Sequence, residues 1–257
     1  MSELIERVKL GVDVLNYILP EGVPRNSLIL IEGSGGSGKS IITMHIAREF
    51  ISRGEEVLFV ELDDDPETLV DNLSSLGVDP LKLREENKLF AIDGYSFRIK
   101  GKARKRCPIV VEEINPQNID ALISRIINVI DGAGIMNRGL LILDSLNEVM
   151  AYSEASKVGE LVRELRANIA KARGIVTIVV LHTSTEDTRM FANALDYVVD
   201  GVIEAETVTQ TPMGIELPIP LRQIMVKKMK GVSHRTGWTL FTIDKEGVKP
   251  VVIKLKT

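Results

Sequence analysis

The first two hundred residues alternate between short apolar runs and segments with helical spacing. Apolar runs at residues 28–31, 57–60, 89–92, 140–143 and 176–181 are typical of strands buried on both faces. Helical spacing predicts helices over residues 41–51, 66–76, 116–130 and 155–173, with Asp65 as the N-cap before Pro66. This alternation predicts an α/β fold: a central, mostly parallel sheet flanked by helices.

The pattern changes after residue 198. Strand-like pieces at residues 199–205, 223–229, 239–243 and 251–255 are separated by Pro and Gly turns, which predicts antiparallel strands added to the sheet. Residues 94–111 lack periodicity and are expected to form a loop. With no internal repeat and no linker, residues 1–257 are predicted to form one domain.

Composition narrows the classes of function. The net charge of −4 gives no general attraction for nucleic acid or anionic membranes, so such contacts would need a local patch. Cys107 is the single cysteine, which excludes an intramolecular disulfide and a thiolate metal cluster and leaves it as a bystander thiol. No apolar run approaches the roughly 20 residues that span a bilayer, and the N-terminus lacks a signal core. We therefore expect a cytoplasmic protein without a membrane partner.

A phosphate-binding loop follows the first buried strand. The sequence from Gly33 to Ser40 fits the pattern G-x-x-x-x-G-K-[ST], in the required order of strand, glycine-rich loop and helix. Backbone N–H groups of such a loop and the helix N-terminus attract phosphate, while the lysine reaches the β- and γ-phosphates. The predicted ATP-binding residues are Ser34, Gly35, Gly36, Ser37, Gly38, Lys39, Ser40 and Ile41.

A phosphate-bound Mg²⁺ needs an acidic partner. Asp144 ends the apolar run 140–143, at the carboxyl edge where open α/β sheets bind ligands. Ser40 and Asp144 are therefore the predicted metal ligands, although Asp144 could instead cap a turn with Ser145.

These motifs resemble those of the KaiC-like ATPases of the RecA superfamily. Residues 11–16 and 22–31 are similar to the family's opening segment, residues 60–66 to the end of its second strand, and residues 226–247 to its Lys-x-Arg-Gly-x-x-His segment. The resemblance runs from residue 10 to 252. It implies a RecA-like P-loop NTPase fold, a single-domain protein related to archaeal RadA paralogues, and homo-oligomers, commonly hexameric rings, with ATP between subunits.

The resemblance also implies roles for five further residues. Asp63 and Asp64 stand where the family has a Glu-Glu pair that activates water. Apart from the resemblance, Glu61 is a nearby substitute, because residues two apart on a strand share a face. Lys228 and Lys230 stand where a Lys and an Arg reach a neighbour's γ-phosphate, and His234 matches a histidine near the neighbour's nucleotide. Aspartate is shorter than glutamate and an ammonium lacks the guanidinium fork, so hydrolysis is expected to be slow. The aspartates could instead cap the next helix, and the lysines could line a solvated hairpin.

Two weaker signals remain. The loop carrying Lys100, Lys102, Arg104, Lys105 and Arg106, with Tyr95 and Phe97 beside it, could bind single-stranded DNA or could simply be solvated. His182 reads as a hydrogen-bonded buried histidine, while Thr183 or Ser184 could sense the γ-phosphate. Glu148 reads as a cap or a solvated residue of the next helix.

Three functions are consistent with these residues. The first is a Mg²⁺-dependent ATPase that acts at subunit interfaces. The second is an ATP-dependent regulatory or scaffold module with little hydrolysis, which the Asp-for-Glu and Lys-for-Arg differences favour. The third is a DNA recombination or repair accessory that binds single-stranded DNA through the basic loop.

Overall fold

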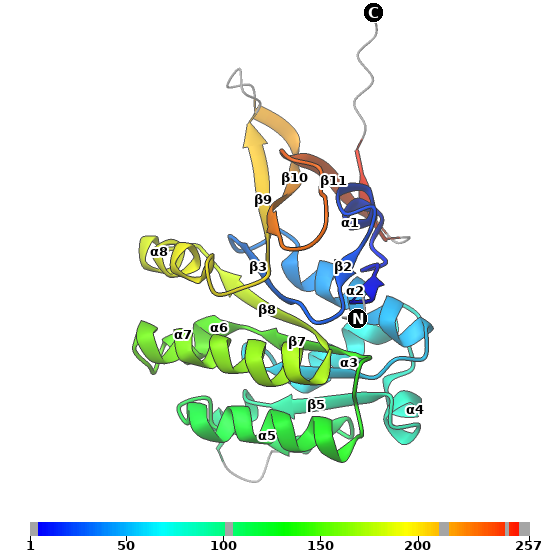
Figure 1. Cartoon of the computed structure of the whole chain (residues 1–257), viewed down its shortest axis with the longest axis vertical. Helices are drawn as coiled ribbons and strands as arrows, with labels where there is room; N and C mark the ends of the chain where they lie inside the picture. The colour runs from blue at the N-terminus through cyan, green and yellow to red at the C-terminus, as the bar shows by residue number, and fades with distance from the viewer. Residues whose placement is uncertain (1–4, 101–104, 211–215, 245–246, 252–257) are drawn as a thin grey trace, which may run out of the picture.

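The fold is built on one mixed β-sheet (Figure 1). The computed structural model describes residues 5–100, 105–210, 216–244 and 247–251. Within these residues ten strands pair in the order β12-β11-β10-β9-β3-β8-β7-β4-β5-β6, and β1 (Arg7–Val8) pairs separately with β2 (Val23–Pro24). The ten are β3 (Leu28–Gly33), β4 (Val57–Glu61), β5 (Leu89–Asp93), β6 (Val110–Glu113), β7 (Leu140–Asp144), β8 (Val176–His182), β9 (Gly201–Gln210), β10 (Glu216–Met229), β11 (Thr239–Asp244) and β12 (Gly247–Pro250).

Strand direction divides the sheet. The strands from β9 to β6 are parallel, whereas β10, β11 and β12 are antiparallel additions at one side. The mostly parallel sheet with antiparallel C-terminal strands is therefore confirmed. In Figure 1 the antiparallel strands extend away from the helix-covered part of the sheet.

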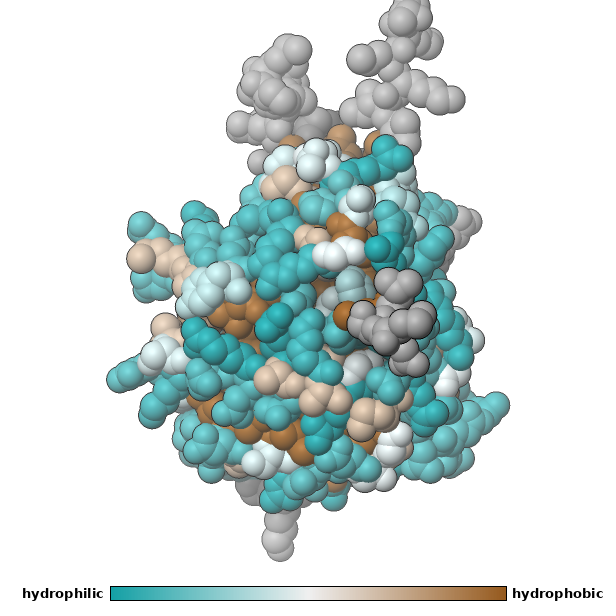
Figure 2. All heavy atoms as spheres, viewed as in Figure 1, coloured by the Kyte–Doolittle hydropathy of each residue, from teal (hydrophilic) through white to brown (hydrophobic). Residues whose placement is uncertain are grey.

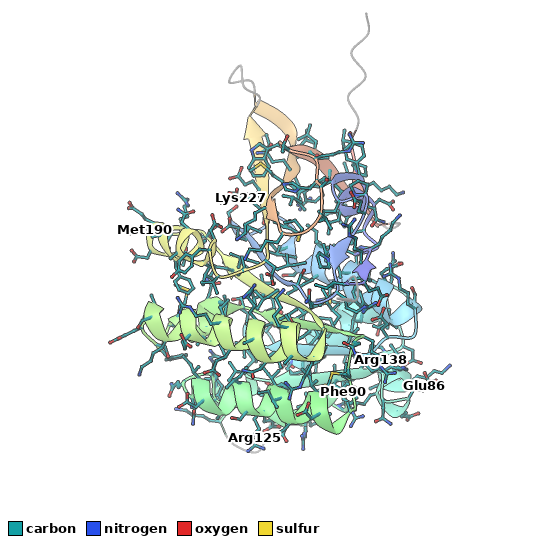
Figure 3. The ribbon with its side chains drawn as sticks, viewed as in Figure 1. Glu86, Phe90, Arg125, Arg138, Met190 and Lys227 are labelled. Carbon is teal, nitrogen blue, oxygen red and sulfur yellow. The ribbon has the colours of Figure 1, made fainter. Side chains whose placement is uncertain are left out.

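Helices cover both faces of the parallel part. One face packs against α2 (Lys39–Ser52), α3 (Pro66–Ser75) and α4 (Pro80–Glu85), while α1 (Asp13–Ile18) packs on the antiparallel strands β11 and β12. The other packs against α5 (Ile119–Gly132), α6 (Leu146–Met150), α7 (Ala155–Glu164) and α8 (Glu186–Leu195). Figure 1 shows α5 and α7 lying side by side in front of the sheet. Figure 3 shows Met190 at the outer side of α8, pointing away from the sheet.

Burial on both faces explains the apolar runs. Ile29 and Ile31 belong to the core under α1 and α2, while Leu28 and Leu30 belong to the core under α5 and α7. Because successive strand residues point to opposite faces, a strand covered on both sides must be apolar at every position.

Most of the predicted elements are confirmed, with shifted ends. The predicted N-cap is present, since the Asp65 side chain accepts a hydrogen bond from the Glu67 N–H. The helix predicted over residues 155–173 consists of α7 followed by a π-helical segment, Leu165–Lys171. The strand predicted at 251–255 is not seen at Val251 and otherwise lies outside the described residues; β12 ends just before it. The assignment of residues 1–257 to one domain stays a prediction.

Several short elements were not predicted. The expected loop over residues 94–111 contains a 3₁₀ turn, Ser96–Arg98, and the start of the edge strand β6. Helices α4, α6 and α8 were also missed. Two of these have only six and five residues, too short for a periodic pattern to show.

The outer surface is mainly hydrophilic on the face formed by α5 and α7, with small apolar areas between polar ones (Figure 2). Among the helices that the structure describes, none combines the length and the apolar character needed to cross a membrane.

Candidate functional site

The loop between β3 and α2 has the backbone geometry of a phosphate cradle. Gly36 and Gly38 take φ values of 78° and 96°, which side chains with a Cβ rarely adopt. Gly38 directly precedes α2, so the helix N-terminus faces the loop. A Cβ at Gly35 would meet nothing within 4 Å, so this position has room for a side chain.

Lys39 is folded into this loop. Its Nζ donates hydrogen bonds to the carbonyls of Gly33 and Ser34, both at 2.8 Å, and the residue is 3% exposed. Burial lowers the pKa of Lys39 to about 8, although the carboxylates of Asp144 and Asp63 favour its charged form. An anion in the cradle would offer the ammonium a stronger partner than these carbonyls.

Ser40 and Asp144 meet across the carboxyl edge of the sheet. The Ser40 hydroxyl donates to Oδ2 of Asp144 at 3.4 Å. The other oxygen, Oδ1, is buried and has no hydrogen-bond partner among the described residues. Burial, followed by the nearby charge of Asp63, raises the pKa of Asp144 to about 6. A hydroxyl beside a buried carboxylate with a free oxygen fits Mg²⁺, which prefers oxygen ligands.

This buried carboxylate has a consequence for stability. Because the folded chain holds the pKa of Asp144 above its usual value, stability falls as pH rises from about 4 to about 6. Asp144→Asn removes the charge, so we expect the melting temperature of the nucleotide-free protein to rise by about 2–8 °C at pH 7.5, and less at pH 5. Differential scanning calorimetry measures this, with the exposed Asp131→Asn as control. A lower melting temperature for Asp144→Asn at pH 7.5 would contradict it.

The two aspartates predicted to activate water, Asp63 and Asp64, are placed differently. Oδ2 of Asp63 accepts hydrogen bonds from the Ser145 hydroxyl at 2.8 Å and faces Nε2 of His182 at 3.2 Å. Burial favours a higher pKa for Asp63, but these two partners outweigh it and the pKa falls below its usual value. Asp64 is exposed and accepts from the Asp65 N–H. Asp63 is therefore the better placed of the pair.

Glu61 lies deeper in the same acidic group. It is 6% exposed and pairs in register with Asp144 on β7. Burial and the charges of Asp144, Asp64 and Asp63 raise the pKa of Glu61 well above its usual value. The raised pKa disfavours the ionised form of Glu61, whereas the lowered pKa of Asp63 favours its ionised form, so Asp63 is the better acceptor for a hydrogen bond from water.

Glu148 is a site residue that the sequence did not reveal. It is half-buried on α6 and forms an ion pair with Arg98, whose guanidinium also stacks on Phe97 at 4.5 Å. Burial and then the charge of Asp63 act to raise the pKa of Glu148, and Arg98 acts against them. The net pKa is raised. Glu148 is therefore a neighbour of Asp63, neither a cap nor a solvated residue.

The end of β8 closes the site. His182 is partly exposed and lines a cavity of about 270 Å³ with Ser40, Asp63 and Asp144. The predicted hydrogen bond of His182 is present, to Asp63, but its predicted burial is wrong. Asn147 fixes its backbone, accepting from the His182 N–H at 2.7 Å and donating to its carbonyl at 2.9 Å.

The two residues after His182 reach the phosphate loop. Thr183 donates its N–H to the Gly33 carbonyl at 3.0 Å, and the Ser184 hydroxyl accepts from the Gly35 N–H at 3.3 Å. Ser184 is thus the side chain of the pair that contacts the loop. Its role as a phosphate sensor stays a prediction.

Strand β10 brings an unpredicted arginine to the same loop. Nε of Arg222 donates to the Gly36 carbonyl at 3.2 Å, and a Cβ at Gly38 would lie 3.0 Å from the Ile243 side chain of β11. Nothing in the local sequence marks Arg222, because pairing between distant strands places it there. Beside Ile243, a groove of about 570 Å³ runs from Ser40 toward α3 and is lined by Ile41, Met44, His45, Asn72, Ser75 and Leu76.

The two lysines predicted to reach a neighbour's γ-phosphate lie near the amino ends of the parallel strands, whereas the phosphate loop lies at their carboxyl ends. Lys228 lies near the end of β10 and Lys230 directly follows it; the last residue of β10 pairs with Gly201, which in turn pairs with Ile29 of β3. The Nζ of Lys228 donates to the carbonyls of Asp196 and, at 3.0 Å, Val199. Burial, and then the charge of Lys230, lowers its pKa. Lys228 is therefore held by the protein and is not a solvated side chain.

Asp200 is the shared partner of several polar groups near the amino ends of the parallel strands. Its buried carboxylate accepts from Arg166 at 2.8 Å and from the Leu28 N–H at 3.1 Å, and it forms ion pairs with Lys171 at 3.0 Å and Lys230 at 3.8 Å. Farther along β10, Lys227 (Figure 3) pairs with Glu32 of β3 at 2.9 Å.

His234 follows in the turn after β10. It is half-buried and next to Arg235, whose backbone N–H and Nε donate to carbonyls of α1. Neither His234 nor the two lysines lies at the phosphate loop of the same chain.

The basic loop is only partly described. Lys102 and Arg104 lie outside the described residues, and Lys100 and Lys105 are exposed. Arg106 pairs with Glu113 at 3.9 Å and donates to the Val111 carbonyl at 2.7 Å.

Together, fold and loop geometry define the class as a RecA-like P-loop protein. The sequence matches the family model described as "ATPase: KaiC" over residues 8–255. The chain belongs to this KaiC ATPase family, which supports nucleotide binding and ATPase activity at that general level.

Individual relatives agree with this assignment. The chain is 27% identical to the UPF0273 protein MJ1359 of Methanocaldococcus jannaschii, with 95% of this chain and 96% of that protein covered. It is 24% identical to the UPF0273 protein PF1931 of Pyrococcus furiosus, with 95% and 94% covered. The crystal structure of the KaiC-like protein PH0186 of Pyrococcus horikoshii OT3 is similar in fold. Its TM-score is 0.74 at 20% identity, with 97% of this chain and all of that one covered.

Proposed function

We propose that the protein binds ATP with Mg²⁺ at the loop of residues 34–40 and hydrolyses it slowly, at sites completed by neighbouring subunits of a homo-oligomeric ring in the cytoplasm. The observation that carries the proposal is the position of Lys39. Its ammonium group lies inside the loop and donates hydrogen bonds to two loop carbonyls. From this position it can donate to the oxygens of a bound phosphate instead.

Different residues of the chain would bind the phosphates, the metal ion and the base of ATP. Loop N–H groups and the start of α2 attract the phosphates, and Lys39 contacts the β- and γ-phosphates. Ser40 and Asp144 would hold Mg²⁺, which neutralises charge on the phosphate oxygens. The groove beside Ile41, Leu76 and Ile243 is apolar enough to take the base.

Asp63 is the proposed water-positioning residue. Its low pKa keeps the carboxylate ionised and able to accept a hydrogen bond from water. Its hydrogen bond from Ser145 fixes its orientation. Lys228, Lys230 and His234 would act on a neighbour's nucleotide, which agrees with their distance from the loop of their own chain.

A regulatory module with little turnover is the second candidate. It is favoured by the contacts of Asp63, whose Oδ2 already faces both Ser145 and His182, and by the ion pair of Lys230 with Asp200. For the DNA-binding alternative the described part of the loop is divided: Arg98 and Arg106 are engaged by carboxylates, whereas Lys100 and Lys105 are exposed.

Single-turnover phosphate release separates these candidates. Asp63→Asn should lower the rate by about 10²-fold or more while leaving the binding of a fluorescent ATP analogue within a few-fold. The matched variant Asp64→Asn, at an exposed neighbour, should change the rate less than about threefold. Equal effects of the two variants would contradict the role of Asp63. If the wild type binds nucleotide but releases no phosphate, the slow-ATPase proposal is wrong and the regulatory module is the better account.

A further inference from the structure

A cation-binding set that includes an imidazole lies beside the phosphate loop. Asp63, Asp144 and His182 come from the ends of β4, β7 and β8, which are neighbours in the sheet. One donor atom of each lies within 4.8 Å of the others. Oδ2 of Asp63 and Nε2 of His182 are 3.2 Å apart. Two adjacent ligand atoms that bind the same ion at about 2.1 Å lie about 3 Å from each other, so the observed distance suits a shared ion.

The free oxygen of Asp144 is a second, independent sign of a ligand. Asp144 is 8% exposed, and its Oδ1 has no hydrogen-bond partner among the described residues. A buried carboxylate oxygen without a partner is costly, and a cation in the adjoining cavity would satisfy it.

The surrounding charges favour a cation even without nucleotide. Asp63, Asp64 and Asp144 line the cavity, while the Lys39 ammonium is bonded to carbonyls of the loop. The ligands are also held in place: Ser145 donates to Asp63, and Asn147 fixes the backbone of His182.

We propose that Asp63, Asp144 and His182, with the Ser40 hydroxyl nearby, bind a divalent transition-metal ion in the nucleotide-free protein in preference to Mg²⁺. Mg²⁺ selects oxygen ligands, whereas imidazole nitrogen suits transition metals. The inference rests on the proposed function in that Ser40 and Asp144 are shared with the nucleotide site.

Mn²⁺ is the strictest probe, because it is the weakest binder of the divalent first-row series and is paramagnetic. Titration of nucleotide-free protein, followed by electron paramagnetic resonance, should show one bound Mn²⁺ per chain. Pulsed measurements should show nitrogen coupling from one imidazole. Mg²⁺ should displace the ion only at concentrations at least about tenfold higher.

Two variants test the ligand assignment. His182→Ala should abolish the nitrogen coupling and weaken Mn²⁺ binding at least about tenfold, whereas Thr183→Ala, at the next residue along the chain, should change neither. Absence of bound Mn²⁺, or bound Mn²⁺ without nitrogen coupling, would overturn the inference. Titration with the fluorescent ATP analogue keeps the two proposals apart. Nucleotide binding without a nitrogen-coupled ion defeats only this inference, and a nitrogen-coupled ion without nucleotide binding defeats only the proposed function.

Discussion

Lys39→Ala should lower the affinity for ATP in the presence of Mg²⁺ by at least about 100-fold. The variant loses a charge that bonds directly to phosphate oxygens, and one or two charge-assisted hydrogen bonds contribute about 1.5–3 kcal/mol each. A tenfold change in affinity corresponds to about 1.4 kcal/mol, so the loss is measurable by fluorescence titration.

The same substitution should have a smaller effect on the fold. The carbonyls of Gly33 and Ser34 lose their donor, which costs about 1–3 kcal/mol if water does not replace it. Part of this loss of stability is offset, because the substitution also removes a buried ammonium whose pKa is lowered by burial. Lys82→Ala is the matched control, since Lys82 is on the exposed surface of α4. Unchanged nucleotide affinity in Lys39→Ala would contradict the proposed function.

Asp200→Ala should destabilise the protein by about 1–3 kcal/mol, because the N–H of buried Leu28 loses its acceptor while three partly exposed cations lose a shared partner. Arg166, Lys171 and Lys230 would lose their shared carboxylate, and the Leu28 N–H would lose its acceptor. Urea unfolding monitored by circular dichroism measures the change. Asp131→Ala, which removes an exposed partner of Arg173, should cost less than about 1 kcal/mol.

The pH dependence of stability is a second measure of the contacts of the Asp200 carboxylate. Burial alone favours a higher pKa for Asp200, but Arg166, the Leu28 N–H and Lys171 outweigh it and depress the pKa. Asp200 therefore contributes stability above its unfolded pKa of about 3.9, and this is lost as pH falls through the lower folded value. Asp200→Asn, which keeps the side-chain volume, serves if the alanine variant does not fold. An Asp200 variant as stable as wild type at pH 7 would show that the three cations need no carboxylate.

The parts of the site that could be predicted are those encoded locally. The loop from Gly33 to Lys39 and the strand ending at Asp144 each carry their signal within a few residues. Burial of strands on both faces makes the sheet visible as apolar runs. The family resemblance then supplied Asp63, which the structure places beside Ser145 and His182.

The missed parts depend on contacts between distant segments. Arg222 reaches Gly36 across 186 positions of the chain, and Arg98 meets Glu148 across 50. Such pairs follow from strand order and register, which no window of sequence reveals. The same holds for Asp200, whose partners come from the π-helical segment, β10 and the start of β3.

Strand β10 has contacts of functional interest at both ends. Arg222 touches the phosphate loop of its own chain, while Lys228 and Lys230 lie at the far edge, around Asp200. One stretch of chain therefore joins a residue at the phosphate loop to the two lysines that we propose act on a neighbour's nucleotide.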